Sequence, residues 1–258
     1  MMAVLRLIWA GWRFHVKSLT LSGFFLLTSS VQPILFATMA YFMFRAGSSE
    51  QSLLYVALGS GLMGIWSSTL FGSGGAISWQ RWQGTLEVSI AAPAPFVLVL
   101  IPITLATATI GLYSLTATLL WGKLFFDVPF EIAHPLLFAL SIPATILGLG
   151  MLGLVLAASF ILYRNANALS NLLEFPVWLV TGLLVPLSLF PGWVRPISWV
   201  LAPTWGVRAI RDSALGEGAP LAAIGMCLAL AACYFVIGTV LIGHFERLAR
   251  ERATLSLT

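Results

Sequence analysis

Glu174 is the one acidic residue inside a long apolar run of this sequence, and it is the first candidate for chemistry. Asn171 precedes it by three residues and Trp178 follows it by four, so on a helix the three side chains share one face. A carboxylate within a membrane helix costs free energy and often marks a substrate path or a proton relay. A structural alternative stays open: the carboxylate would lie at the inner membrane surface, paired with Arg164 or with water.

Further polar side chains lie in other apolar runs. They could line a path, or they could hydrogen-bond between helices, which is the common role of small polar residues in membranes. We predict that Trp66 and Ser67 line a translocation path together with Asn171, Glu174 and Trp178. The other polar candidates are Ser29, Ser30, Gln32, Ser68 and Thr69.

Motifs for metal binding, hydrolysis and nucleotide binding are missing. The three histidines are far apart in the sequence, and neither H-E-x-x-H nor G-x-S-x-G occurs. A phosphate-binding P-loop needs glycines, a lysine and a hydroxyl residue in fixed register. The only Gly-Lys pair, Gly122 and Lys123, lacks both the first glycine and the hydroxyl residue. We therefore expect a chain that is not itself catalytic and that binds no metal or cofactor of its own.

These residues are embedded in a very apolar chain. Of its 258 residues 59% are hydrophobic and 9% are charged, which is the composition of a membrane protein. A helix of about 20 mostly apolar residues spans a bilayer and satisfies its own backbone hydrogen bonds there. The sequence predicts an all-α integral membrane protein with six transmembrane helices in a single domain, 1–258. The six runs are Ser18 to Phe44, Ser52 to Trp79, Val88 to Gly122, Ile132 to Tyr163, Ala166 to Phe190 and Ala219 to Gly243.

The distribution of basic residues predicts the orientation, because lysine and arginine concentrate in cytoplasmic loops. One side would carry Arg6, Arg13, Lys17, Arg81, Arg164, Arg247, Arg250 and Arg252, and the other Arg45, Lys123, Arg195, Arg208 and Arg211. Both termini are therefore expected on the cytoplasmic side of the cell membrane. The net charge of +4 is explained by these anchors, and no nucleic-acid partner is expected.

Two segments outside the spans have their own patterns. Residues 1–17 carry a narrow apolar stripe beside basic residues, which predicts a helix lying in the membrane interface, with a frayed tail as the alternative. Residues 190–217 are too charged to span and are divided by prolines, so we expect a re-entrant helical hairpin in the outer leaflet. Arg208, Arg211 and Asp212 in it are expected to form a solvated or locally paired cluster, rather than a substrate anion site.

The polar stretch 78–92 separates the second and third runs. On a helix, Trp79, Trp82, Leu86 and Ile90 would form a stripe, with glutamine and glutamate side chains opposite. Such a helix would lie along the cytoplasmic surface, with one face available to a partner. A surface helix that contacts no partner fits the same periodicity.

Two groups of residues resemble the permeases of ABC-2 type transporters. The first is the stretch of Arg81, Gly84, Thr85, Leu86 and Glu87, followed by Ala92 and Pro93, which is similar to that family's loop between the second and third helices. The second follows the fifth run and is similar to the family's extracellular hairpin. It consists of Gly182, Pro186, Phe190, Pro191, Gly192, Trp193, Pro203, Arg208, Arg211 and Gly216.

The resemblance implies the transmembrane subunit of an ABC exporter, similar to small drug-exporter permeases. It implies pairing with a second permease, identical or related, and with two cytoplasmic ATPase subunits that hold ATP and Mg. Stretch 78–92 would be the coupling helix that rests on the ATPase, and the cargo a hydrophobic or amphipathic small molecule moved by alternating access within membrane lipid. The alternative is a channel or proton-coupled carrier that needs no ATPase and uses Glu174.

Overall fold

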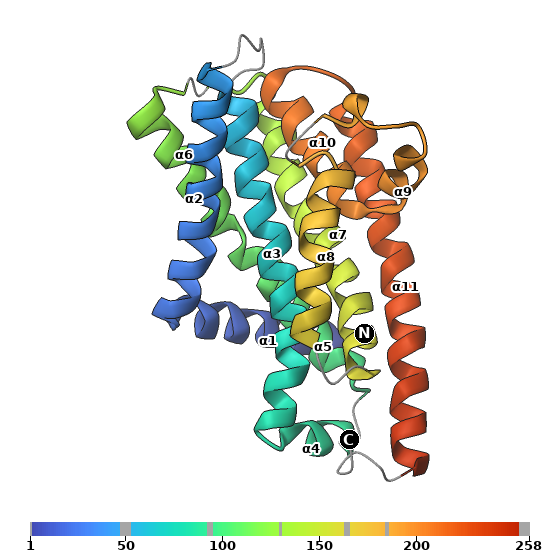
Figure 1. Ribbon diagram of the computed structural model, residues 1–258. Helices are drawn as coiled ribbons and strands as arrows, with labels where there is room; N and C mark the ends of the chain where they lie inside the picture. The colour runs from blue at the N-terminus through green and yellow to red at the C-terminus, as the bar shows by residue number, and fades with distance from the viewer. Residues whose placement is uncertain are drawn as a thin grey trace.

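The described residues of the computed structural model, 2–46, 53–91, 95–128, 131–162, 166–183 and 186–252, form a bundle of helices without strands (Figure 1). The predicted all-α class is confirmed for these residues. The helices are α1 (Met2–Leu21), α2 (Gly23–Ala46), α3 (Leu53–Trp82), α4 (Thr85–Ala91), α5 (Val97–Ile110), α6 (Leu112–Phe126), α7 (Pro135–Leu162), α8 (Ala166–Val180), α9 (Val194–Val200), α10 (Ala202–Leu215) and α11 (Pro220–Arg252), with a 3₁₀ turn, η1 (Leu187–Leu189).

Within the described part of the chain, five stretches are long and apolar enough to cross a membrane: Phe25–Met43, Leu53–Trp82, Val97–Phe126, Pro135–Phe160 and Pro220–Arg247. They coincide with five of the six predicted runs, so the chain is a multi-pass membrane protein. The fifth run is shorter than predicted, because α8 has only 15 residues, or about 22 Å of helix. Gly182, with a φ of 78°, follows the end of α8 and stops the helix well before Phe190.

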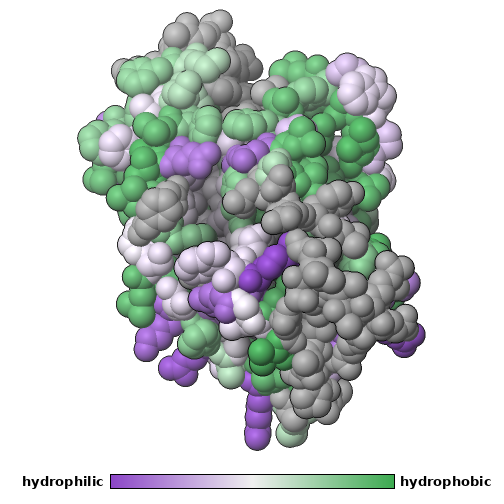
Figure 2. All heavy atoms as spheres, turned by 60° about the horizontal axis from the view of Figure 1, so that its bottom comes forward, coloured by the Kyte–Doolittle hydropathy of each residue, from purple (hydrophilic) through white to green (hydrophobic). Residues whose placement is uncertain are grey.

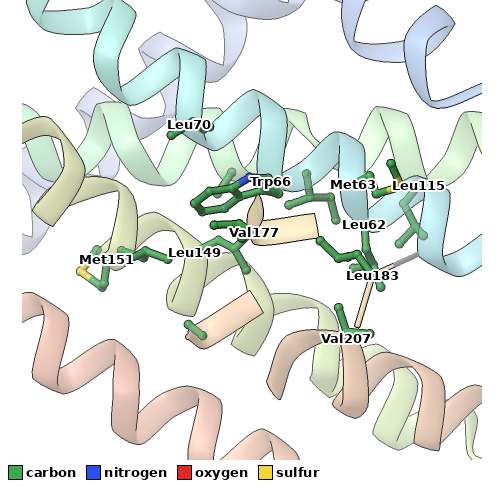
Figure 3. Close-up of a cluster of buried hydrophobic side chains, with 14 of the residues drawn as sticks. Leu62, Met63, Trp66, Leu70, Leu115, Leu149, Met151, Val177, Leu183 and Val207 are labelled. Carbon is green, nitrogen blue, oxygen red and sulfur yellow. The ribbon is translucent and has the colours of Figure 1, made fainter. Parts of the chain in front are cut away.

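Close packing of α3 against α5 and α6 depends on glycines. A Cβ on Gly61 would lie 2.6 Å from the Cα of Leu115, and one on Gly111 would lie 2.5 Å from the Cα of Ile65. Small residues let membrane helices approach so closely because no side chain separates the backbones. Around this contact the core contains large apolar side chains from α3, α6, α7 and α8, with Trp66 beside Val177 (Figure 3).

Helix α1 lies across the bundle at the start of α2, crosswise to the long helices (Figure 1). The indole Nε1 of Trp12 donates a hydrogen bond to Oγ1 of Thr109, 3.0 Å away, and Gly11 packs on Pro102. Leu5 and Trp9, on the same helix, are exposed, as the apolar stripe of an interfacial helix would be. The N-terminal segment is therefore an ordered helix rather than a frayed tail, and it packs on α5.

Candidate functional site

The stretch 78–92 is not one helix. Helix α3 continues to Trp82, and α4 begins at Thr85 after an elbow at Gly84, whose φ is 68°. The amide of Gly84 donates to the carbonyl of Arg81 at 3.1 Å, and the hydroxyl of Thr85 donates to the carbonyl of Gln80 at 3.3 Å. A positive φ is available to glycine at little cost, which explains why the chain turns at this residue.

The elbow divides the predicted apolar stripe between two directions. Leu86 is buried, with 5% of its surface exposed, whereas Trp82 is 78% exposed and Val88 71% exposed. The side chains of Trp79, Glu87 and Ile90, as well as Ala92 and Pro93, lie outside the described part of the chain. Leu86 therefore attaches α4 to the bundle, and large apolar side chains remain on the outer surface of the elbow. Seen from this end, hydrophilic side chains lie among apolar ones (Figure 2).

Glu246 of α11 links that helix to the start of α5, near the elbow. It was not among the residues predicted from the sequence to be functional. Its Oε2 accepts a hydrogen bond from the amide of Phe96, 3.2 Å away, at the start of α5. Helix α11 extends to Arg252, beyond the predicted run, and contacts both α4 and α5. This helix start needs an acceptor for its unpaired amides, and a carboxylate from another helix supplies it. Helix α4 thus contacts α3 and α11, and Glu246 of α11 bonds to the start of α5.

A cavity of about 270 Å³, the inner cavity, lies between α2, α3 and α8. Its wall includes polar and aromatic side chains from all three helices. Among them are Ser29, Gln32 and Phe36 of α2, Ser67 and Phe71 of α3, and Trp178 of α8.

Glu174 lies behind this wall, 4% exposed, and its Oε1 accepts a hydrogen bond from Ser67 Oγ at 2.6 Å. The ring of Trp178 meets Phe36 edge-on, with centroids 5.2 Å apart, and Phe175 at 4.9 Å. No basic side chain of the described residues pairs with Glu174, and Arg164 is not among those residues. The carboxylate therefore bonds to α3 inside the bundle.

The five predicted path residues are only partly brought together. Ser67, Glu174 and Trp178 meet at the inner cavity. Trp66, next in sequence to Ser67, points into the apolar core and is not in the cavity wall (Figure 3). Asn171 is exposed, whereas Glu174, one turn further along α8, is buried against α3. The two residues are neighbours on the helix, as their spacing predicts, but only Glu174 faces the bundle.

Arg211 is buried rather than solvated, at the opposite end of the bundle, with 6% of its surface exposed, and the Asp212 carboxylate lies near it as local pairing predicts. Its Nη1 donates to the carbonyl of Gly182 at 2.6 Å, and its Nη2 donates to that of Leu183 at 2.7 Å. Its guanidinium also lies 3.6 Å from the ring centroid of Tyr55. The early end of α8 leaves carbonyls without helical partners, and a cation there satisfies them. Burial lowers the pKa of Arg211 to about 10, so it is still charged at neutral pH.

Other charged residues of the same segment lie near this arginine. Arg208 lies over the ring of Trp205 at 5.0 Å, and both arginines line a second cavity of about 260 Å³ with Asp212 and Glu217. Burial raises the pKa of the Asp212 carboxyl. Pro191 and Trp193 are exposed at the start of α9. Helix α10 packs against α7, α11 and α3, so residues 190–217 fold back onto the bundle.

The comparison with protein families identifies the group to which the fold belongs. The family model described as "ABC-2 type transporter" matches residues 6–215, a range that includes α2 through α10 and most of α1. Among curated proteins no significant match is found. The match covers most of the chain and both segments noted in the sequence, and on this basis the chain belongs to the ABC-2 type transporter family, whose members are membrane transport permeases.

Proposed function

We propose that this permease is the transmembrane subunit of an ATP-driven exporter, and that the elbow of α3 and α4 is its contact with separate ATPase subunits. The chain would pair with a second permease, identical or related, and two ATPases holding ATP and Mg would bind beneath the pair. The cargo is a hydrophobic or amphipathic small molecule. The elbow faces the cytoplasm, as do both termini and the exposed basic side chains of α1, Arg6, Arg13 and Lys17.

The exposure of Trp82 and Val88 at the elbow is the observation that carries this proposal. Tryptophan dominates many protein interfaces, because one side chain buries a large apolar area on binding. Figure 1 places α4 at the end of the bundle, beyond the level of α1. A position beyond the helix expected at the membrane surface suits contact with a protein better than contact with lipid.

The arrangement also supports a mechanical path from the elbow to the inner cavity. Helix α3 is continuous from Trp82 to Ser67, a distance of about 22 Å at 1.5 Å per residue. It packs against α2, α5, α6, α7 and α8, so a push at α4 would shift α3 against the helices that form the cavity. Alternating access requires this kind of relative movement.

The test compares two exposed tryptophans at opposite ends of the bundle. The variant Trp82→Ala changes the elbow, and the control Trp193→Ala changes a residue that is 67% exposed on the outer hairpin. With the cognate ATPase co-purified, we expect Trp82→Ala to reduce the amount of bound ATPase by at least about tenfold, as for an interface hot spot. Trp193→Ala should bind as the unchanged protein does. Equal retention of the ATPase by both variants would refute the assignment of the elbow.

A carrier without an ATPase is the second candidate, favoured by the buried Glu174 that lacks a basic partner among the described residues. This candidate predicts proton-coupled transport by the reconstituted permease alone, abolished in Glu174→Gln. The exporter predicts no uphill transport unless the ATPase and ATP are supplied. Reconstitution with and without the ATPase separates the two candidates.

A further inference from the structure

We propose that the inner cavity binds an amphipathic organic cation, with Glu174 as its counter-ion and the surrounding aromatic rings as its platform. The inference rests on the proposed transport function and names the chemical class of the cargo. It is carried by the position of one carboxylate beside an aromatic cavity.

The carboxylate of Glu174 lacks a charged partner among the described residues. Its one hydrogen bond there, from Ser67, reaches only Oε1. A carboxylate taken out of water stays ionised at reasonable cost only when a cation or several hydrogen-bond donors compensate it. Ser67 also belongs to the cavity wall, so Glu174 lies directly behind the surface that a ligand would touch. A cationic ligand would supply the missing charge at this point.

The cavity wall adds aromatic faces suited to the same ligand. Phe25, Phe36, Phe71 and Trp178 all line it. The negative faces of such rings attract ammonium groups, more strongly where water is excluded. The apolar parts of an amphipathic molecule would pack on the same rings. An anion would meet the negative faces and the nearby carboxylate, and none of the described residues that line the cavity is a lysine or an arginine.

The position of the cavity fits entry from the inner side. Most of its residues on α2 lie within the half of that helix next to α1, and Phe36 lies just past the middle. Helix α1 marks the proposed cytoplasmic surface, so the cavity would lie at the depth of the inner leaflet. Gln32 on its wall is exposed, and the cavity can be reached from outside the bundle. Its volume of about 270 Å³ accommodates one aromatic ring with a substituted ammonium group.

The experiment measures binding to the permease alone in lipid nanodiscs. The probe is benzyltrimethylammonium, followed by ligand-observed NMR, with phenylmethanesulfonate as an anion of similar size and empty nanodiscs as the background. We expect the cation to bind at least about tenfold more tightly than the anion, and Glu174→Gln to lose roughly 10- to 100-fold of the cation affinity. Glu131→Gln removes the same charge from an exposed position and should bind as the unchanged protein does.

One further variant guards against a folding defect. Glu174→Asp keeps the charge and should keep the preference for the cation. Equal binding of cation and anion, or unchanged cation affinity in Glu174→Gln, would overturn the proposal. The binding measurement needs no ATPase. If the co-purification test shows no ATPase contact at the elbow, the proposed exporter function is refuted but the proposed cation site is not. If the ATPase binds at the elbow but the permease shows no preference for the cationic probe, only the proposed cation site is refuted.

Discussion

Gly72 and Gly75 lie one helical turn apart in α3, yet alanine at the two positions should have opposite effects on stability. A Cβ on Gly72 would lie 2.6 Å from the Cβ of Thr107 on α5, whereas a Cβ on Gly75 has no atom within 4 Å. The glycine-rich stretch that contains both residues could act as a hinge or as a packing surface. The contacts show that Gly72 packs against α5, whereas no atom of the described residues packs against the Cβ position of Gly75.

The expected magnitudes follow from these distances. Alanine is favoured over glycine inside a helix by about 0.5–1 kcal/mol, so Gly75→Ala should stabilise the protein by about that amount. In Gly72→Ala the contact must widen from 2.6 Å to the 3.4 Å of an ordinary contact. The Cβ of Thr107 is fixed by its backbone, so the helices themselves must move apart. Overpacking of this kind costs about 1–3 kcal/mol. Both variants gain the same free energy from replacing glycine by alanine in a helix. Their free energies of unfolding should therefore differ by the overpacking cost alone, about 1–3 kcal/mol.

The measurement is equilibrium unfolding of the purified permease in mixed detergent micelles, with the fluorescence of its ten tryptophans as the signal. Circular dichroism before denaturation controls for a change of helix content. Equal stability of Gly72→Ala and Gly75→Ala would refute the close approach of α3 and α5 at Thr107. A lower stability of Gly75→Ala than of the unchanged protein would show that this position is packed as well.

Two other substitutions test the ends of the bundle. Arg211→Met removes two charge-assisted hydrogen bonds to Gly182 and Leu183, and part of this loss is offset because a buried charge disappears. We expect about 2–4 kcal/mol lower stability in the same unfolding assay, while Arg208→Met should change little; equal effects of the two would contradict the role of Arg211. Gly84→Ala forces a side chain into the left-handed region at a cost of about 1–2 kcal/mol. It should impair stimulation of the ATPase, in contrast to Gly192→Ala at the outer end, where a Cβ meets open space.

The helices themselves were largely predictable, because a bilayer imposes long apolar runs whatever their neighbours are. Five of the six predicted runs appear as candidate spans. The short α8 was missed, because Gly182 and Pro186 interrupt a stretch that is apolar throughout and hydropathy does not register the interruption. The elbow at Gly84 was hidden for a similar reason: periodicity continues through a glycine, but the backbone turns there.

The candidate sites show where sequence reasoning ends. The apolar surroundings of Glu174 and the Gly-Thr-Leu-Glu stretch marked these segments as functional candidates from the sequence alone. Their partners could not be predicted, because Ser67 and Glu174 are 107 residues apart, and Glu246 and Phe96 are 150 apart. Burial of Arg211 depends on where α8 ends, and exposure of Asn171 depends on how α8 rotates against α3. Such contacts arise only when helices pack, so composition and spacing determined the membrane helices of this permease, whereas the tertiary structure decided which polar groups meet.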